Sequence, residues 1–252
     1  MVRWTVYPLL CSLLIGCVTV DESGTEQREV DEIQAAEARI TLGLTYMKNG
    51  QWQRARDNLE LALEYAPKYY RAQNAMAYYY QRVDEPEQAE AMYRQALRDS
   101  PKNGDVKNNF GVFLCSQGRY DEAISAFEGA IKQPYYYLTS ASYENAGLCS
   151  LKAGNNPEAR EYFTKALSYD PYRAKSMLEL SLLDIEEGNL NEARVRLFKF
   201  NKRYGYKADS LWLLVQLEHK ADRESLVSKY AGILEQEYPD SLQYQKYLAN
   251  EY

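Results

Sequence analysis

The side chains best suited to covalent or metal chemistry in this 252-residue chain are four cysteines and one histidine. They are Cys11, Cys17, Cys115, Cys149 and His219. His219 has no cysteine or histidine neighbour at the spacing of a metal site, so a surface histidine is the simpler interpretation. No glycine-rich phosphate loop follows a predicted strand, and paired acids such as Glu186 and Glu187 recur along the chain without a distinctive spacing. We therefore predict no enzyme, no metal site and no bound cofactor.

Cys17 follows a segment typical of an exported protein. Arg3 supplies a positive charge, and Trp4–Leu14 is an apolar core of the length of a secretory signal, too short to span a membrane. The residues Leu14-Ile15-Gly16-Cys17 resemble the lipobox of bacterial lipoproteins, in which a small residue lets the peptidase reach the bond before the cysteine. Cys11 lacks a small residue in front of it. The alternatives are an ordinary signal that is cut elsewhere, or an internal cysteine.

The lipobox resemblance implies a signal peptide over residues 1–16 and a covalent lipid on Cys17. Several acyl chains, such as palmitate, give a stable membrane anchor where a single chain is marginal. Lipoproteins kept in the inner membrane often carry Asp at the next position; Val18 stands there instead, which implies the periplasmic face of the outer membrane. Residues 17–35 are otherwise polar and acidic, and we expect the lipidated cysteine to be followed by a flexible tether.

The rest of the chain repeats with a period of 34 residues, most clearly in small side chains. These are Gly43, Ala77 and Gly111; Ala55, Ala89 and Ala123; and Ala62, Ala96 and Ala130. The pattern resembles the tetratricopeptide repeat, two antiparallel helices that cross closely at small residues and stack on their neighbours. We predict an all-α, right-handed superhelix of about six repeats over residues 36–241, with a capping helix over 242–252.

The predicted repeats cover 36–69, 70–103, 104–137, 140–173, 174–207 and 208–241. Two additional residues in the segment QPYYYLTS separate the third repeat from the fourth. Cys115 is therefore the twelfth residue of its repeat and Cys149 the tenth of the next, a difference that rotates a helical position by about 200°. The two thiols can then face each other, and the periplasm favours disulfides. We predict a Cys115–Cys149 disulfide; the alternative is two free, buried cysteines.

The surface best suited to binding is the concave groove that the first helix of each repeat lines. In the second repeat the groove positions are Arg71, Asn74, Tyr78, Gln81 and Arg82. In the first repeat they include Ile40, Leu44 and Met47, an apolar patch with Tyr78 beside it. Ile40 and Leu44 stand where some tetratricopeptide proteins carry a carboxylate-binding Lys and Asn, so that clamp is missing. We predict that the patch binds an amphipathic helix or an extended apolar segment; the alternative is ordinary core, or packing under residues 33–36.

Three consecutive tyrosines in the insertion, Tyr135–Tyr137, form a second candidate surface. They cannot all face inward, and exposed tyrosine is common in interfaces. We choose the central residue, Tyr136, as a candidate partner-binding residue. The alternative is partial burial against the neighbouring turn.

The order of these features resembles one family over nearly the whole chain, the type IV pilus biogenesis/stability lipoproteins, which are the pilotins of pilus secretins. The residues that carry the resemblance are LLIGC, LGLTYMKNGQWQRARDNLELAL, NNFGVFLCSQGRYDEAISAFEGAI and the Cys115/Cys149 pair. The resemblance implies an outer-membrane lipoprotein that binds the secretin subunit and promotes its outer-membrane localisation and multimerisation. Loss of such a protein is expected to affect pili and twitching motility.

A different role is the alternative: a tetratricopeptide lipoprotein scaffold of the outer-membrane β-barrel assembly machinery, whose loss harms growth in general. The formal net charge of −6 argues against nucleic acid as a partner, because nucleic acid requires a basic stripe. Nothing in the sequence indicates a small-molecule substrate.

Overall fold

The computed structural model describes residues 22–252, and over this range it contains helices and no strand. The predicted signal peptide and the predicted lipidation site, Cys17, lie outside the described residues. The helices are α1 (Glu22–Lys48), α2 (Trp52–Tyr65), α3 (Tyr70–Arg82), α4 (Pro86–Asp99), α5 (Gly104–Ser116), α6 (Tyr120–Ile131), α7 (Thr139–Lys152), α8 (Asn156–Tyr169), α9 (Ala174–Glu187), α10 (Leu190–Tyr204), α11 (Ala208–Lys220), α12 (Glu224–Glu237) and α13 (Leu242–Leu248).

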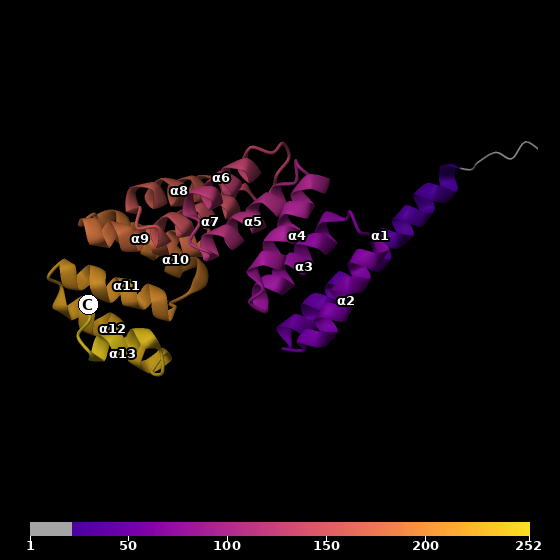
Figure 1. The fold of residues 1–252 in the computed structure, drawn as a ribbon. Helices are drawn as coiled ribbons and strands as arrows, with labels where there is room; N and C mark the ends of the chain where they lie inside the picture. Colours follow the sequence, from indigo (N-terminus) through magenta and orange to yellow (C-terminus); the bar gives the residue numbers. More distant parts are fainter. Residues whose placement is uncertain (1–21) are drawn as a thin grey trace, which may run out of the picture.

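Consecutive helices pair into six antiparallel hairpins, α1/α2 through α11/α12, one for each predicted repeat (Figure 1). The first hairpin begins earlier than predicted, because α1 starts at Glu22. Short turns join the helices of a pair, as at Gly50, whose φ of +70° suits a residue without a side chain. The structure is therefore the all-α tetratricopeptide superhelix that the 34-residue period predicts.

Small residues stand where the two helices of a hairpin touch. A Cβ atom added to Gly111 would lie 2.7 Å from the ring of Phe127, and one added to Gly147 would lie 2.7 Å from the ring of Phe163. Both rings are almost completely buried. The aromatic residue of the second helix thus fills the space that the glycine of the first helix leaves open, which explains the recurring pair of residue types.

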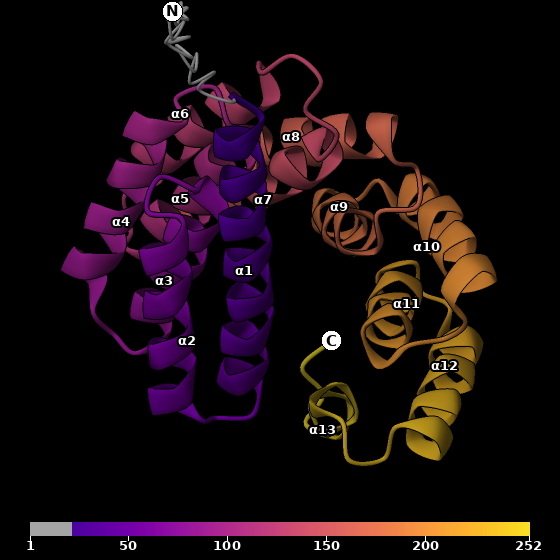
Figure 2. The same cartoon turned by 90° about the vertical axis from the view of Figure 1, so that its right-hand side faces the viewer.

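The hairpins follow a curved path. Viewed as in Figure 2, α9, α11 and α13 lie on the inner side of the curve and face α1, whereas α10 and α12 lie on its outer side. The last helix, α13, is shorter than the predicted 242–252 and contacts α11 and α12. Beyond its end the chain returns so that Tyr252, together with Tyr247, packs against the buried cluster of Trp212 and Val215.

Residues 22–34 do not form the predicted flexible tether, because α1 already begins at Glu22 and continues into the first repeat. The N-terminal end of α1 extends beyond α2 in Figure 1. Most residues of this segment favour a helix, and Arg28 pairs with Glu32 one turn away at 3.0 Å. Once Ala36 and its neighbours pack on α2, each further residue extends an existing helix, which needs no new nucleus.

A disulfide joins α5 to α7 through Cys115 and Cys149, with 5.8 Å between the two Cα atoms. Both residues are buried, in the cluster that also contains Phe113 and Phe127. The bond therefore links the third repeat to the fourth across the two-residue insertion, as the rotation argument predicts.

Candidate protein-binding groove

A hollow of about 360 Å³ lies among the first three repeats, at the positions expected for the concave groove. Its lining residues are Ile40, Leu44, Arg71, Asn74, Ala75, Tyr78, Gln81, Tyr93, Asn109 and Val112. They come from α1, α3, α4 and α5. We call this surface the groove.

Three apolar side chains of the groove remain accessible. Leu44 is 38% exposed, Tyr78 is 40% exposed and Val112 is 39% exposed, and each comes from the first helix of a different repeat. Ile40 and Tyr93 line the same hollow but are buried, so they form its floor. The groove thus has an apolar edge contributed by three consecutive repeats above a closed hydrophobic floor.

The predicted patch residues divide into two groups. Leu44 and Tyr78 are accessible in the groove, whereas Ile40 and Met47 are buried and belong to the core of the first two repeats, so these two are not a free partner surface. The reason lies in helix periodicity: Ala36, Ile40 and Met47 lie along one helical stripe that packs on α2 and α3. Met47 lines no part of the hollow, and the prediction is wrong for it.

Tyr136 is also not the exposed residue of its triplet. A Cβ atom on Gly104 would lie 2.4 Å from the Tyr136 ring, and the Tyr136 hydroxyl lies 2.9 Å from Oγ of Ser142. Burial raises the pKa of Tyr136. Tyr135 and Tyr137 are the exposed members, at 101% and 80%. Tyr136 therefore packs between α5 and α7, and the sequence of three identical residues carried no signal to distinguish them.

One end of the groove carries charged groups. Arg71 pairs with Glu37 at 2.7 Å, and Tyr69 donates a hydrogen bond to the same carboxylate. Burial and this hydrogen bond raise the pKa of Tyr69. Burial also raises the pKa of the neighbouring Asp105, although the positive charge of Arg71 acts to lower it. A partner bound here meets a half-exposed guanidinium whose position is already fixed by an acid of the preceding repeat.

Tyr78 is held at the edge of the groove by Arg82, one turn further along α3. The Nη1 atom of Arg82 donates a hydrogen bond to the Tyr78 hydroxyl at 3.1 Å, and the Arg82 guanidinium lies 5.8 Å from the centre of the Trp52 ring. These contacts restrict the Tyr78 side chain before any partner binds, which lowers the entropy cost of using it as a contact residue.

Asn74 gives the groove an unused hydrogen-bond acceptor. Its Oδ1 atom is buried and accepts no hydrogen bond from any residue in the range 22–252. A peptide N–H group can pair with this acceptor only when the Asn74 side chain turns toward the hollow, and leaving it unpaired is costly. The sequence placed Asn74 at a groove position, but only the structure reveals that its oxygen has no partner.

Metal binding, membrane crossing and the histidine can be considered for the described part of the chain. No group of three or more His, Cys, Asp or Glu residues within it is arranged to hold a metal ion. None of the helices between residues 22 and 252 combines the length and the apolar character needed to cross a membrane. His219 contacts Glu224 and the ring of Tyr252 near the surface.

Comparisons with known proteins agree with the repeat architecture. Tetratricopeptide-repeat models match residues 36–69, 74–137 and 114–176. An uncharacterized protein of Haemophilus influenzae is 34% identical over 175 residues, which cover 69% of this chain and 93% of that protein. A solved structure of PilW, described as a widely conserved type IV pilus biogenesis factor, is 27% identical with a TM-score of 0.75, covering 85% of this chain and 99% of that one.

The type IV pilus assembly protein PilF of Pseudomonas aeruginosa is 34% identical to this chain over 248 residues, which cover 98% of both proteins. The solved PilF structure superposes with a TM-score of 0.75 over 87% of this chain and 99% of that one. Identity at this level along almost the entire length, together with the shared repeat fold, establishes the relationship. The chain belongs to the PilF/PilW-like family of tetratricopeptide-repeat proteins.

Proposed function

We propose that this protein is a pilotin of type IV pilus biogenesis. In this role it binds the secretin subunit, brings it to the outer membrane and promotes its multimerisation. The relatives named for pilus assembly and pilus biogenesis support the process. The observation that carries the binding role is the groove, where Leu44, Tyr78 and Val112 form an accessible apolar edge over a buried floor.

The groove suits a segment of the secretin that inserts one or two apolar side chains. Burial of the exposed parts of Leu44 and Tyr78 supplies hydrophobic free energy. Arg71 and Asn74 add directional contacts, since one offers N–H donors and the other a buried acceptor without a partner. No step consumes energy or forms a covalent bond, so the mechanism is binding followed by delivery.

Delivery depends on the lipid that we propose for Cys17. Acyl chains on its sulfur and amine give the complex its affinity for the outer membrane, where the bound subunits become concentrated and ring assembly is favoured by mass action. A Cys17→Ser protein is expected to fold and to be lost from the outer-membrane fraction. Normal secretin assembly in the outer membrane of cells that carry only this variant would show that the anchor is not required.

Photo-crosslinking in living cells tests the binding role. A photoreactive residue replaces Leu44 in the groove, and the captured protein is identified by mass spectrometry. The matched control places the same residue at Leu42, which is 43% exposed on the same helix and does not line the hollow. We expect the secretin subunit to be captured from position 44 and not from position 42. Capture of a β-barrel assembly component in its place would overturn the proposal.

A further inference from the structure

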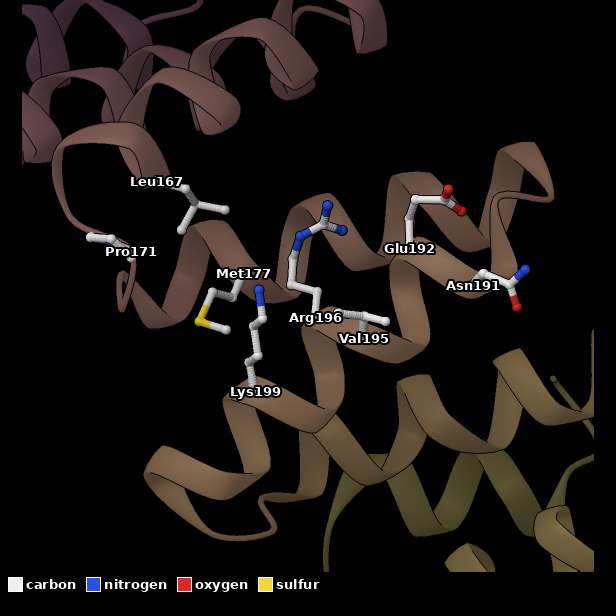
Figure 3. A pocket seen from close by; sticks show the side chains of 8 residues that line it. All are labelled: Leu167, Pro171, Met177, Asn191, Glu192, Val195, Arg196 and Lys199. Atoms are coloured by element: carbon white, nitrogen blue, oxygen red, sulfur yellow. The ribbon is translucent and has the colours of Figure 1, made fainter.

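A second hollow, of about 490 Å³, lies among α8, α9 and α10, in the fifth repeat and at the end of the fourth. Its apolar lining consists of Leu167, Pro171, Met177 and Val195. In Figure 3 the side chains of Leu167, Met177 and Lys199 lie at one end of the view, and Asn191 and Glu192 lie at the other. Since α10 is on the outer side of the curve in Figure 2, and no lining residue is shared with the groove, this is a separate surface.

The exposed apolar side chains beside this hollow are more accessible than those of the groove. Val195 is 55% exposed and Phe198 is 68% exposed, and both belong to α10. They are three residues apart, so they are neighbours on one side of the helix. An exposed phenylalanine beside an apolar hollow offers a partner apolar area to bury, and its burial would supply hydrophobic free energy.

The same helix is basic in a chain whose net charge is −6. Two of its arginines neutralise buried acids: Arg194 pairs with Glu218 at 2.9 Å, and Arg196 pairs with Asp184. The others face outward. Lys199 and Lys202 are exposed and form no ion pair with any residue from 22 to 252.

We propose that the α10 face, defined as Val195, Phe198, Lys199 and Lys202, binds an acidic amphipathic segment of a partner protein. An apolar side chain of the segment enters the hollow beside Val195, and its carboxylates meet the two lysines. The charge complementarity selects an acidic partner, since both lysines lack an acid of their own. Lys199 lies at one end of the hollow and the carboxylate of Glu192 at the other (Figure 3), so the hollow has a positive end and a negative end. A peptide segment that binds in one direction fits this arrangement better than a lipid surface, which is anionic throughout.

The proposal is tested with labelled 16-residue model peptides and the full chain, carrying Cys17→Ser so that acyl chains cannot bind the probe. One peptide has leucines at helical spacing with glutamates between them. A second replaces the glutamates by lysines, and a third replaces the leucines by serines. Fluorescence anisotropy measures the dissociation constant, and circular dichroism confirms that each protein variant is folded. We expect the leucine–glutamate peptide to bind and the other two not to bind.

Charge-reversal variants then locate the site. The Lys199→Glu/Lys202→Glu variant is expected to bind the leucine–glutamate peptide with at least tenfold lower affinity than the wild type. It is also expected to gain affinity for the leucine–lysine peptide. The Val195→Ser/Phe198→Ser variant is expected to lose affinity for the leucine–glutamate peptide without gaining affinity for the leucine–lysine peptide. The matched control, Lys102→Glu/Lys152→Glu, introduces the same charge at exposed positions outside the hollow and should leave binding unchanged.

Two results overturn the proposal. The first is that the wild-type chain does not bind the leucine–glutamate peptide, or that the wild-type chain and the Lys199→Glu/Lys202→Glu variant bind it with equal affinity. The other is co-sedimentation with phosphatidylglycerol vesicles that depends on Lys199 and Lys202 while no peptide binds, which would assign the α10 face to a membrane surface.

Discussion

Removing the accessible apolar edge of the groove should weaken secretin binding by a predictable amount. The double substitution Leu44→Ala/Tyr78→Ala removes two side chains that are 38% and 40% exposed in the free protein. Full burial of a large apolar side chain is worth about 1.5–3 kcal/mol, so the exposed part of each contributes about 0.6–1.2 kcal/mol on binding. The pair then contributes about 1.2–2.4 kcal/mol, which corresponds to a roughly 8- to 60-fold increase in the dissociation constant.

The assay is a titration of the purified soluble part of the secretin subunit into the full-length protein, followed by calorimetry or anisotropy. The matched control is Leu42→Ala/Tyr65→Ala, because these side chains are 43% and 37% exposed and do not line the groove. Both double variants should unfold at similar denaturant concentrations, since all four residues are partly exposed. Equal affinity of the two double variants for the secretin would refute the assignment of the groove as its binding site.

Further predictions concern stability and pH. Replacing both Cys115 and Cys149 by alanine should lower the free energy of unfolding by about 3–4 kcal/mol, because the disulfide closes a loop of 34 residues. If the wild-type chain runs with the same mobility on gels with and without reductant, the disulfide is absent. Gly147→Ala should destabilise by about 1–2 kcal/mol, because its Cβ would lie 2.7 Å from a buried ring. Urea unfolding tests this against Gly129→Ala, whose Cβ has only an ordinary contact at 3.5 Å. Asp105→Asn should stabilise the fold near about pH 7, because burial raises the pKa of this acid in the folded state and so penalises its charged form. The gain should fade as the pH drops toward about 4, where the acid becomes protonated in both states, and a gain independent of pH would refute this cause.

The repeat architecture could be predicted from sequence because it depends on residue size at fixed spacing. A glycine is required where a ring of the facing helix occupies the space of a Cβ atom, as at Gly111 and Gly147, and the 34-residue period shows where such small residues recur. The disulfide could be predicted for a related reason: a two-residue insertion changes the direction of Cys149 by a rotation that helix geometry fixes. The first inference uses local periodicity, and the second adds to it the oxidising compartment that the N-terminal segment implies.

The groove could be predicted only in part, because its members differ in burial and not in residue type. Ile40, Leu44 and Met47 look alike in sequence, but only Leu44 remains accessible once α3 packs against α1. Tyr136 is distinguished from Tyr135 and Tyr137 by the position of Gly104, which lies more than thirty residues earlier in the chain. Such contacts between segments far apart in the sequence decide exposure, and no local pattern records them.

The placement of the disulfide bears on how two binding surfaces can work in one array. Stability in a repeat protein is passed between adjacent repeats, so surfaces far apart along the array are normally free to flex relative to each other. Here Val112 of the groove lies three residues before Cys115 on α5, and the disulfide fastens this helix to α7. The α10 face begins beyond the cross-linked pair, in the fifth repeat. The bond therefore stiffens the stretch between the two surfaces, which favours two partner segments bound at a fixed separation over two that move independently.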